Sequence, residues 1–343
     1  MAGPYELTPE QLASLMPGEP AYRVTQVWQG LYDQGHRPAE MTALPVALRD
    51  RLETALPPAL TAVRSAQSSD GRTIKWLWAL ADGARVETVL MHYPDRATVC
   101  VSSQAGCAMG CRFCATGQAG FRRQLETGEI VEQVVAARRA VAPARLTNVV
   151  FMGMGEPLAN YDRWWAAVCR LHGDLGLSAR HLTVSTVGVV PGIRRLAAEA
   201  LPVNLAVSLH AGNDRLRDEL VPLNHRYPLA ALTEACRQYR AAKGRRLSFE
   251  WALIDGVNDR TADADELAAI AIPLGAHVNL IPLNRTPGFP LQGTPPIGVR
   301  RFRDRLAELG LNATVRVNRG TDIDAACGQL AGATPVALQA SRS

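Results

Sequence analysis

The chain has 343 residues, of which 47% are hydrophobic and 20% are charged, a composition typical of a soluble globular protein with one large and one smaller domain. No apolar run has membrane-spanning length, and the first ten residues lack a signal-peptide pattern. Seven cysteines, an odd number, favour a reducing cytoplasm over a disulfide framework. The net charge of +5 divides into −2 over residues 1–99 and +7 over residues 100–343, which suits a polyanionic substrate.

Residues 1–62 read as helical. Thr8-Pro9-Glu10 is a typical helix start, apolar residues recur at helical spacing over 22–32, and a third helical stretch covers 46–56. Residues 72–92 alternate as strands do, with Asp82-Gly83 as the turn of a β-hairpin. We therefore expect a helical domain over 1–70 and a β-hairpin extension over 71–96.

From about residue 97, short apolar runs alternate with longer helix-compatible stretches. Repeated β-then-α units predict a parallel sheet with right-handed crossovers, and six strands predict an α/β fold with an open, partial (β/α)6 barrel over 97–332. In such folds the chemistry lies at the carboxyl ends of the strands. The tail at 333–343 has no clear role. The expected strands are 97–102, 148–152, 181–187, 203–209, 247–253 and 277–282, and the expected helices are 127–141, 160–172, 191–200, 229–243 and 262–273.

A cysteine triplet follows the first barrel strand. Cys107, Cys111 and Cys114 have C-x3-C-x2-C spacing, and three thiolates can hold a four-iron cluster while one iron stays open for a ligand. The spacing resembles that of the radical S-adenosylmethionine (SAM) enzymes, in which the open iron chelates the amino and carboxylate groups of SAM. The alternatives are a zinc knuckle or a chance cluster, but no Cys or His follows at zinc-finger spacing.

A glycine-rich turn follows the second barrel strand, where the sequence reads FMGMGEPLAN over 151–160. Glycines at a strand end let the backbone approach a ligand closely. The turn resembles the GGEP-type motif that holds the amino group of SAM, although a plain βα turn is the alternative. Further polar residues follow the later strands, as expected of a site at this edge: Ser185, Ser208-Leu209-His210 and Asn284.

These motifs together with the C-terminal segment resemble one family, the RlmN-type radical SAM methyltransferases that act on adenine C2 of 23S rRNA and tRNA. The resemblance covers about residues 20–332. The matching blocks are CVSSQAGCAMGCRFCATG (100–117), NVVFMGMGEPLAN (148–160), LTVSTVGVVP (182–191), AVSLHAGND (206–214), VNLIPLN (278–284) and RGTDIDAACGQLAG (319–332).

The resemblance implies a role for each matching residue. The cysteine triplet would hold one 4Fe–4S cluster. Cys327 would carry the methyl group as S-methylcysteine, Cys100 would form a transient disulfide with it, and Glu87 would be the proton acceptor. By residue type alone, a hairpin glutamate is a solvated side chain and a lone cysteine a core filler. The SAM site would be lined by Gly155, Glu156, Ser185, Ser208, Leu209, His210 and Asn284.

Carbon 2 of adenine lies between two ring nitrogens and has no lone pair, so it cannot attack a methyl sulfonium as an amine would. The family route therefore uses two SAM molecules per turnover, one to methylate Cys327 and one to generate a radical. The resemblance further implies position 2503 of 23S rRNA and position 37 of tRNA as targets, a reducing partner such as flavodoxin, no membrane partner, a cytoplasmic location and a monomer.

Three alternatives stay open at this point. The related C8-methylating enzymes share most motifs but usually carry Ala where Pro157 stands, and Arg285 departs from the usual proline of this family. A non-catalytic iron–sulfur or zinc RNA-binding protein would need neither Cys327 nor the glycine-rich turn. A radical enzyme acting on a small substrate is the third. Arginines that could meet phosphates, or that are merely solvated, are Arg122, Arg123, Arg237, Arg240, Arg245 and Arg246.

Overall fold

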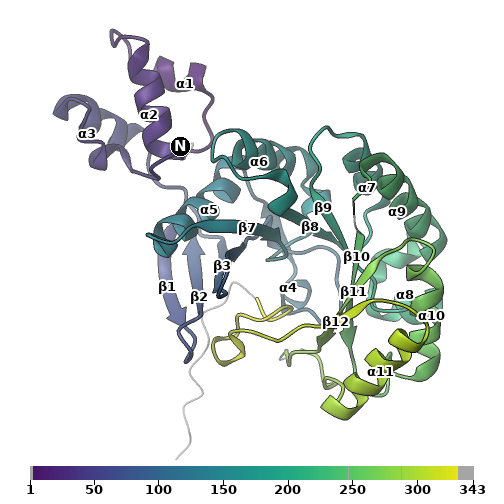
Figure 1. Ribbon diagram of the computed structural model, residues 1–343. Coiled ribbons are helices and arrows are strands. Elements are labelled where there is room, and N and C mark those ends of the chain that lie inside the picture. The colour runs from purple at the N-terminus through teal and green to yellow at the C-terminus, as the bar shows by residue number, and fades with distance from the viewer. Residues whose placement is uncertain (1–2, 246, 287, 331–343) are drawn as a thin grey trace, which may run out of the picture.

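The structure is a computed structural model that describes residues 3–245, 247–286 and 288–330, so the predicted tail at 333–343 lies outside the described residues. Ten strands form one curved sheet in the order β1-β2-β3-β4-β7-β8-β9-β10-β11-β12 (Figure 1). A separate two-stranded sheet pairs β5 (Gln104–Gly106) with β6 (Phe121–Gln124). The large sheet therefore runs without a break from the N-terminal hairpin through the barrel.

The barrel part of the sheet is parallel, as predicted. Each of the six expected strands pairs in parallel with the next, which confirms the partial (β/α)6 barrel. A seventh parallel strand, β12 (Ala313–Val315), was not predicted, because three residues are too few to show an alternating pattern. The six strands are β4 (Ala97–Cys100), β7 (Leu146–Phe151), β8 (Leu182–Thr186), β9 (Asn204–Ser208), β10 (Leu247–Leu253) and β11 (His277–Pro282).

Helices cover the outer face of this sheet (Figure 1). Five of them match predicted stretches: α5 (Thr127–Val141), α6 (Tyr161–Gly173), α7 (Val190–Ala198), α9 (Leu229–Lys243) and α10 (Thr261–Ala271). Two others, α8 (Asp214–Leu220) and α11 (Pro296–Glu308), were not predicted. The apolar residues of α11 do recur at helical spacing, but a Pro-rich approach and four arginines obscure them.

The hairpin extends the barrel sheet at one edge. β2 (Thr73–Ala79) pairs antiparallel with β3 (Arg85–His92), and β3 pairs antiparallel with β4. A further strand, β1 (Thr61–Gln67), pairs with β2 at the outer edge and was not predicted. Its side chains are nearly all exposed, so the sequence has no buried-face alternation to reveal it. The carboxyl end of β4 and the hairpin thus share one continuous surface.

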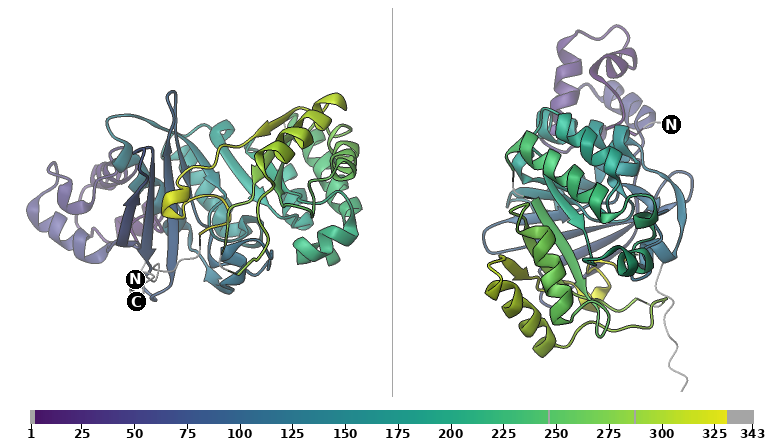
Figure 2. Two further views of the ribbon diagram at one scale, coloured as in Figure 1. Left: turned by 90° about the horizontal axis from the view of Figure 1, so that it is seen from below. Right: turned by 90° about the vertical axis from the view of Figure 1, so that its right-hand side faces the viewer.

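Three short helices precede the sheet, as predicted: α1 (Pro9–Ser14), α2 (Tyr22–Tyr32) and α3 (Val46–Ala55). They lie at one end of the molecule (Figure 2), next to α5 and α6 (Figure 1). Arg170 of α6 donates hydrogen bonds to the carbonyls of Tyr5 at 2.5 Å and Leu7 at 2.8 Å. Buried side chains of these helices belong to the same hydrophobic core as the barrel. The N-terminal helices are therefore fixed to the barrel.

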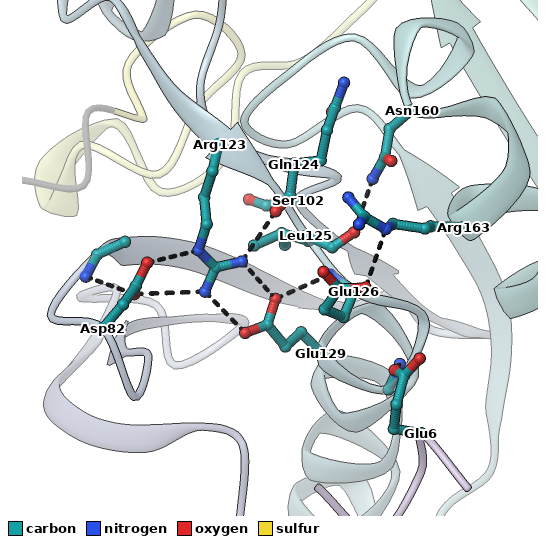
Figure 3. A network of polar contacts seen from close by, with 12 residues as sticks. Glu6, Asp82, Ser102, Arg123, Gln124, Leu125, Glu126, Glu129, Asn160 and Arg163 are labelled. Atoms are coloured by element: carbon teal, nitrogen blue, oxygen red, sulfur yellow. Dashed lines mark hydrogen bonds and ion pairs between the residues drawn. The ribbon is translucent and has the colours of Figure 1, made fainter. Parts of the chain in front are cut away.

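Arg123 joins the hairpin turn to the first barrel helix (Figure 3). Its Nε lies 2.6 Å from Asp82 Oδ2, and its two Nη atoms each lie 2.8 Å from an oxygen of Glu129 on α5. The Arg123 guanidinium lowers the pKa of Asp82 to about 2. Because Arg123 forms ion pairs with two carboxylates of its own chain, it is not merely a solvated arginine and serves as a structural clamp between the hairpin turn and α5.

Glu132 on α5 predicts a pH dependence of stability. Its carboxylate accepts hydrogen bonds from the Ala59 and Leu60 amides at 2.9 and 3.2 Å, and burial raises its pKa from 4.5 to about 7. Burial penalises the charged carboxylate, so the neutral form is favoured in the folded protein. The stability that Glu132 contributes is therefore fully present below pH 4.5 and is lost as the pH rises through 7. Going from pH 8 to pH 5, the wild type should gain on the order of 3 kcal/mol relative to Glu132→Gln in urea unfolding. Equal pH dependence in both proteins would contradict this.

Candidate active site

The cysteine triplet lies on a tightly pinned loop that leads from β5 into α4 (Ala115–Gln118). The Cys107 amide donates to the Gly120 carbonyl at 3.0 Å, and the Cys114 amide donates to the Cys111 carbonyl at 3.2 Å. Gly106 is required here, because a Cβ would lie 1.9 Å from the Gly120 carbonyl oxygen. The short β5–β6 sheet thus holds the loop against the barrel mouth.

The three thiols form one electrostatically coupled group. Burial raises the pKa of the Cys107 thiol to about 12 and that of Cys111 well above its ordinary value, with the neighbouring cysteines adding to both shifts. Such thiols become thiolates only beside a compensating positive charge, which bound iron supplies. Within the described residues, no group of three or more Cys, His, Asp or Glu side chains is arranged so that it could hold a single metal ion. A cluster attaches each cysteine to a different iron, so this donor set fits a cluster better than a zinc ion.

A central cavity of about 160 Å³ opens at the carboxyl ends of the barrel strands. It contains Cys111 and Cys114 on one side and Cys327 on another. Leu209 is the exception among the predicted SAM-binding residues, because its side chain is buried in the core and does not line the cavity. The predicted residues that do line it are Gly155, Glu156, Ser185, Ser208, His210 and Asn284.

The glycine-rich turn after β7 places a buried carboxylate in the central cavity. Gly155 has φ of 100°, and a Cβ there would lie 2.5 Å from the Gln104 Cβ, so only glycine fits. The Glu156 amide donates to Gln104 Oε1 at 2.8 Å, while Glu156 Oε2 accepts from the Val187 amide at 2.9 Å. Burial raises the pKa of Glu156 to about 7. A buried carboxylate in such a position is suited to a cationic amine.

The ends of β8 and β9 add neutral polar groups. Ser185 Oγ and Ser208 Oγ lie 3.4 Å apart across the two strands. His210 adopts φ of 62°, and its Nδ1 accepts from the Ala252 amide at 2.9 Å, which leaves the hydrogen on Nε2. Burial lowers the pKa of His210 to about 3, so the ring is neutral. Hydroxyls and a neutral imidazole at one edge are suited to the polar groups of a nucleoside.

The loop that carries Cys327 is bonded to both the barrel and the cysteine-triplet loop. Asn284 Nδ2 donates to the Cys327 carbonyl at 3.0 Å, and the Ala115 amide donates to the Gly328 carbonyl at 2.8 Å. Thr116 Oγ1 donates to the Leu330 carbonyl at 2.5 Å. The segment, yellow in Figures 1 and 2, runs from β12 back across the open side of the sheet toward the hairpin.

A second cavity of about 120 Å³, the hairpin cavity, lies on the other side of Cys327. Its lining includes Val89, Met91, Cys100 and Cys327, so Cys327 belongs to both cavities and exposes its surface there. Burial raises the pKa of the Cys100 thiol to about 12, and the nearby Cys327 adds to the shift. All seven cysteines are free thiols. The structure thus brings Cys100 and Cys327 together without a bond.

Glu87 lies on the same face of the sheet but in an adjoining cavity. The strand register aligns Lys75, Val89 and Cys100 across β2, β3 and β4, and Glu87 is two residues from Val89 on β3. Its side chain is buried, and Lys75 Nζ lies 3.2 Å from Glu87 Oε1. The two line a side cavity of about 260 Å³ beneath residues 322–324, whereas Glu87 does not line the hairpin cavity.

Sequence reasoning missed two arginines and a glutamate of the site. Arg316 follows the unpredicted strand β12, lines both cavities, and opposes the burial that raises the pKa of Cys327. Glu250 of β10 also faces the central cavity, and its Oε1 accepts from Asn279 Nδ2 at 2.7 Å. Arg217 is fully buried behind the cavity wall. In sequence Arg217 resembles any arginine of a charged helix, so no pattern distinguishes it.

Arg217 braces the strand-end loops that form the central cavity. Its guanidinium donates to the Leu209 carbonyl at 3.0 Å, the Val187 carbonyl at 2.6 Å and Asn224 Oδ1 at 2.8 Å. Arg217→Met should therefore lower the free energy of unfolding by about 3 kcal/mol or more, because several buried acceptors lose their donor. Arg215→Met, on the exposed side of the same helix, is the matched control and should change it little. Equal small effects of the two variants in urea unfolding would contradict the bracing role.

The chain is similar to known proteins along nearly its whole length. Residues 101–268 match the Radical SAM superfamily. A protein of Parafrankia sp. (strain EAN1pec) described as a probable dual-specificity RNA methyltransferase RlmN is 54% identical, over 95% of this chain and 90% of the relative. A protein of the same description from Roseiflexus sp. (strain RS-1) is 49% identical over 96% of each chain.

A solved structure agrees with these relatives. The crystal structure of a radical SAM methyltransferase from Sphaerobacter thermophilus matches with a TM-score of 0.94 and 51% sequence identity, over 97% of this chain and 100% of that one. The barrel, the hairpin and the N-terminal helices thus have counterparts in an experimental structure. Across the residues that the structure describes, no helix is both long enough and apolar enough to cross a bilayer.

Proposed function

We propose that this chain, which belongs to the RlmN family of dual-specificity RNA methyltransferases within the radical SAM superfamily, methylates carbon 2 of adenine in 23S rRNA and tRNA. The observation that carries the proposal is the position of Cys327. Cys327 lines the central cavity, which Cys111, Cys114 and most of the predicted SAM residues also line, and it lines the hairpin cavity that contains Cys100. A methyl group on this sulfur can therefore be received from one cavity and passed to a base in the other.

The residues of the central cavity suit SAM and a 4Fe–4S cluster, which members of this superfamily use. Cys107, Cys111 and Cys114 would hold the cluster, and Glu156 would accept from the amino group of SAM. When bound, the cluster and SAM supply the carbon radical that an electron-poor ring carbon requires. Cys327 and Gly328 of the C-terminal loop form part of the cavity wall and would limit the access of water to that radical.

Cys327 would accept a methyl group from a first SAM molecule, and a second SAM molecule would serve the radical step. The first transfer is a displacement in which the Cys327 thiolate attacks the methyl carbon and the sulfonium sulfur takes the bonding pair. Arg316 favours the thiolate, because its positive charge opposes the burial that raises the pKa of Cys327. Asn284 and Ala115 hold the backbone on either side, so the sulfur stays at the junction of the cavities.

Cys100 would release the methylated base. Once the base is linked through a methylene to the Cys327 sulfur, Glu87 would take the proton from carbon 2. The Cys100 thiolate would then attack the Cys327 sulfur, so that a disulfide forms, the sulfur–carbon bond breaks, and its electron pair passes to the methylene carbon, which takes up a proton and becomes the methyl group. A reductant must afterwards reduce the disulfide, which agrees with a cytoplasmic location.

Other parts of the proposal concern partners. The N-terminal domain at 1–70 would help to grip folded RNA, with the hairpin at 71–96 joining it to the core, and the target adenine must leave its stack to reach the hairpin cavity. A flavodoxin-like protein would supply electrons, and a monomer would suffice because both cavities are lined by one chain.

The product distinguishes this function from C8 methylation. Reconstituted enzyme with SAM, a reductant and unmodified 23S rRNA or tRNA should yield 2-methyladenosine in the digested RNA. Nucleoside mass spectrometry with authentic 2-methyl- and 8-methyladenosine standards checks this. A product that elutes with 8-methyladenosine, or no methyladenosine in either RNA while Cys327 is methylated, would contradict the proposal.

The role of Cys100 predicts a trapped intermediate. Cys100→Ala should still accept a methyl group on Cys327 and still attack RNA, but without the resolving thiol the covalent protein–RNA adduct should accumulate. Gel electrophoresis of the denatured reaction with labelled RNA measures the adduct. Cys236→Ala, a buried cysteine on α9 outside both cavities, is the matched control and should show no adduct. Full turnover without adduct in Cys100→Ala would remove Cys100 from the mechanism.

A further inference from the structure

We propose that Lys75 is a positioning residue for the proton acceptor, and that it couples the Glu87 carboxylate to the loop bearing Cys327. The inference rests on the proposed function, in which Glu87 takes the ring proton. It adds a residue that neither the motifs nor the family resemblance singled out. Its basis is a set of contacts that cross from the hairpin to the C-terminal loop.

Lys75 touches both partners at once. Its Nζ lies 3.2 Å from Glu87 Oε1 and donates to the Asp324 carbonyl at 3.0 Å. Only 11% of the Lys75 side chain and 4% of the Glu87 side chain are exposed, so the ion pair is shielded from solvent. Asp324 lies three residues before Cys327 in the chain. One ammonium group therefore fixes the position of the base relative to the loop that carries the reactive sulfur.

The contact belongs to a wider seam between hairpin and loop. The Ser69 amide donates to Asp322 Oδ2 at 2.8 Å, and Arg319 donates to the His92 carbonyl at 3.3 Å. Asp322 and Arg319 could anchor the loop without Lys75, and Asn284 holds Cys327 from the barrel side. Lys75 differs from these other contacts because its positive charge lies next to the carboxylate of Glu87, the proposed base.

The composition of the chain supports a requirement for lysine at this position. Of its 37 basic residues other than histidine, all but Lys75 and Lys243 are arginine. A sequence so rich in arginine retains lysine where a compact ammonium fits and a planar guanidinium does not. The Lys75 site fits this description, because one ammonium nitrogen contacts both the Glu87 carboxylate and the Asp324 carbonyl while the side chain is largely buried.

The side cavity gives this ion pair a function beyond packing. Lys75 and Glu87 line it together with Arg64, Asp322 and Asp324, while Cys100 and Cys327 line the hairpin cavity instead. Glu87 thus borders this polar space, and it lies two residues along β3 from Val89, which lines the hairpin cavity. A proton taken by Glu87 can leave through the side cavity, so that water need not enter the place where the radical forms.

Lys75→Met tests the proposal, because it keeps the length of the side chain and removes the charge. We expect release of methylated RNA to slow by roughly tenfold or more, since the base loses its position. Cys327 S-methylation, measured by peptide mass spectrometry, should stay at the wild-type level, because Asn284, Ala115 and Thr116 still hold the loop. Lys75→Arg should not restore the rate, because a planar guanidinium does not fit the place of the compact ammonium. Lys243→Met, at the end of α9, is the matched control and should match wild type.

An isotope effect separates positioning from a structural role. With RNA deuterated at adenine C2, Lys75→Met should show a larger kinetic isotope effect on product release than wild type, because proton removal becomes slower than the other steps. Wild-type release rates with an unchanged isotope effect would overturn the proposal. Parallel loss of Cys327 methylation would also overturn it, since Lys75 would then only support the loop.

Two further variants keep the test decisive. Glu87→Gln should stop RNA release while Cys327 methylation persists; if it turns over normally, the proposed role of Glu87 fails, whatever Lys75 does. If Lys75→Met folds poorly because the buried Lys75–Glu87 ion pair is lost, the double variant Lys75→Met/Glu87→Gln removes both charges and restores folding. The double variant should methylate Cys327 at the wild-type level and, like Glu87→Gln, release no methylated RNA, whereas loss of Cys327 methylation in the folded double variant would contradict the positioning role.

Discussion

The structure depends above all on the hydrogen bonds that hold the backbone around Cys327 at the junction of two cavities. Asn284 fixes this backbone from the end of β11, and the first residues of α4 fix it from the cysteine-triplet loop. The barrel strands alone do not place Cys327, because among the described residues it lies on a loop that crosses the open side of the sheet. The C-terminal segment supplies that missing wall.

The two sides of this junction differ in chemistry, and the sheet explains why. The parallel strands end in polar groups that suit a nucleoside with a charged amino acid moiety, whereas the antiparallel hairpin presents Val89 and Met91 beside Cys100. Tyr93, Arg316 and Arg319 also line the hairpin cavity, so aromatic and cationic groups lie beside these apolar side chains, and such a lining suits an RNA base. Because β3 pairs directly with β4, the hairpin and the barrel act as one rigid surface, and Glu87 and Cys100 keep a constant relation to each other.

Much of the barrel could be predicted, because buried strands and amphipathic helices leave periodic patterns; α5 and α9 begin and end at the predicted residues. β1 and β12 could not, since an exposed edge strand and a three-residue strand leave no pattern. The site was predicted through motifs that are local in sequence, such as the cysteine triplet and the glycine-rich turn. Lys75, Arg217 and Arg316 were missed, because each acts through partners that only the fold brings near. The ion pairs of Arg123 with Asp82 and Glu129 could not be predicted either, because the sequence around Arg123 resembles that of any exposed arginine.

Direct mapping of methyl groups on the purified protein tests most sharply whether the sulfur at this junction is the acceptor. Peptide mass spectrometry of anaerobically reconstituted protein incubated with SAM and reductant should find a methyl group on Cys327 and on none of the other six cysteines. This methyl group should be absent when Cys111 or Cys114 is replaced by alanine, because SAM should then no longer bind beside Cys327. An enzyme that methylates RNA while Cys327 remains an unmodified thiol at every stage of turnover would contradict the account.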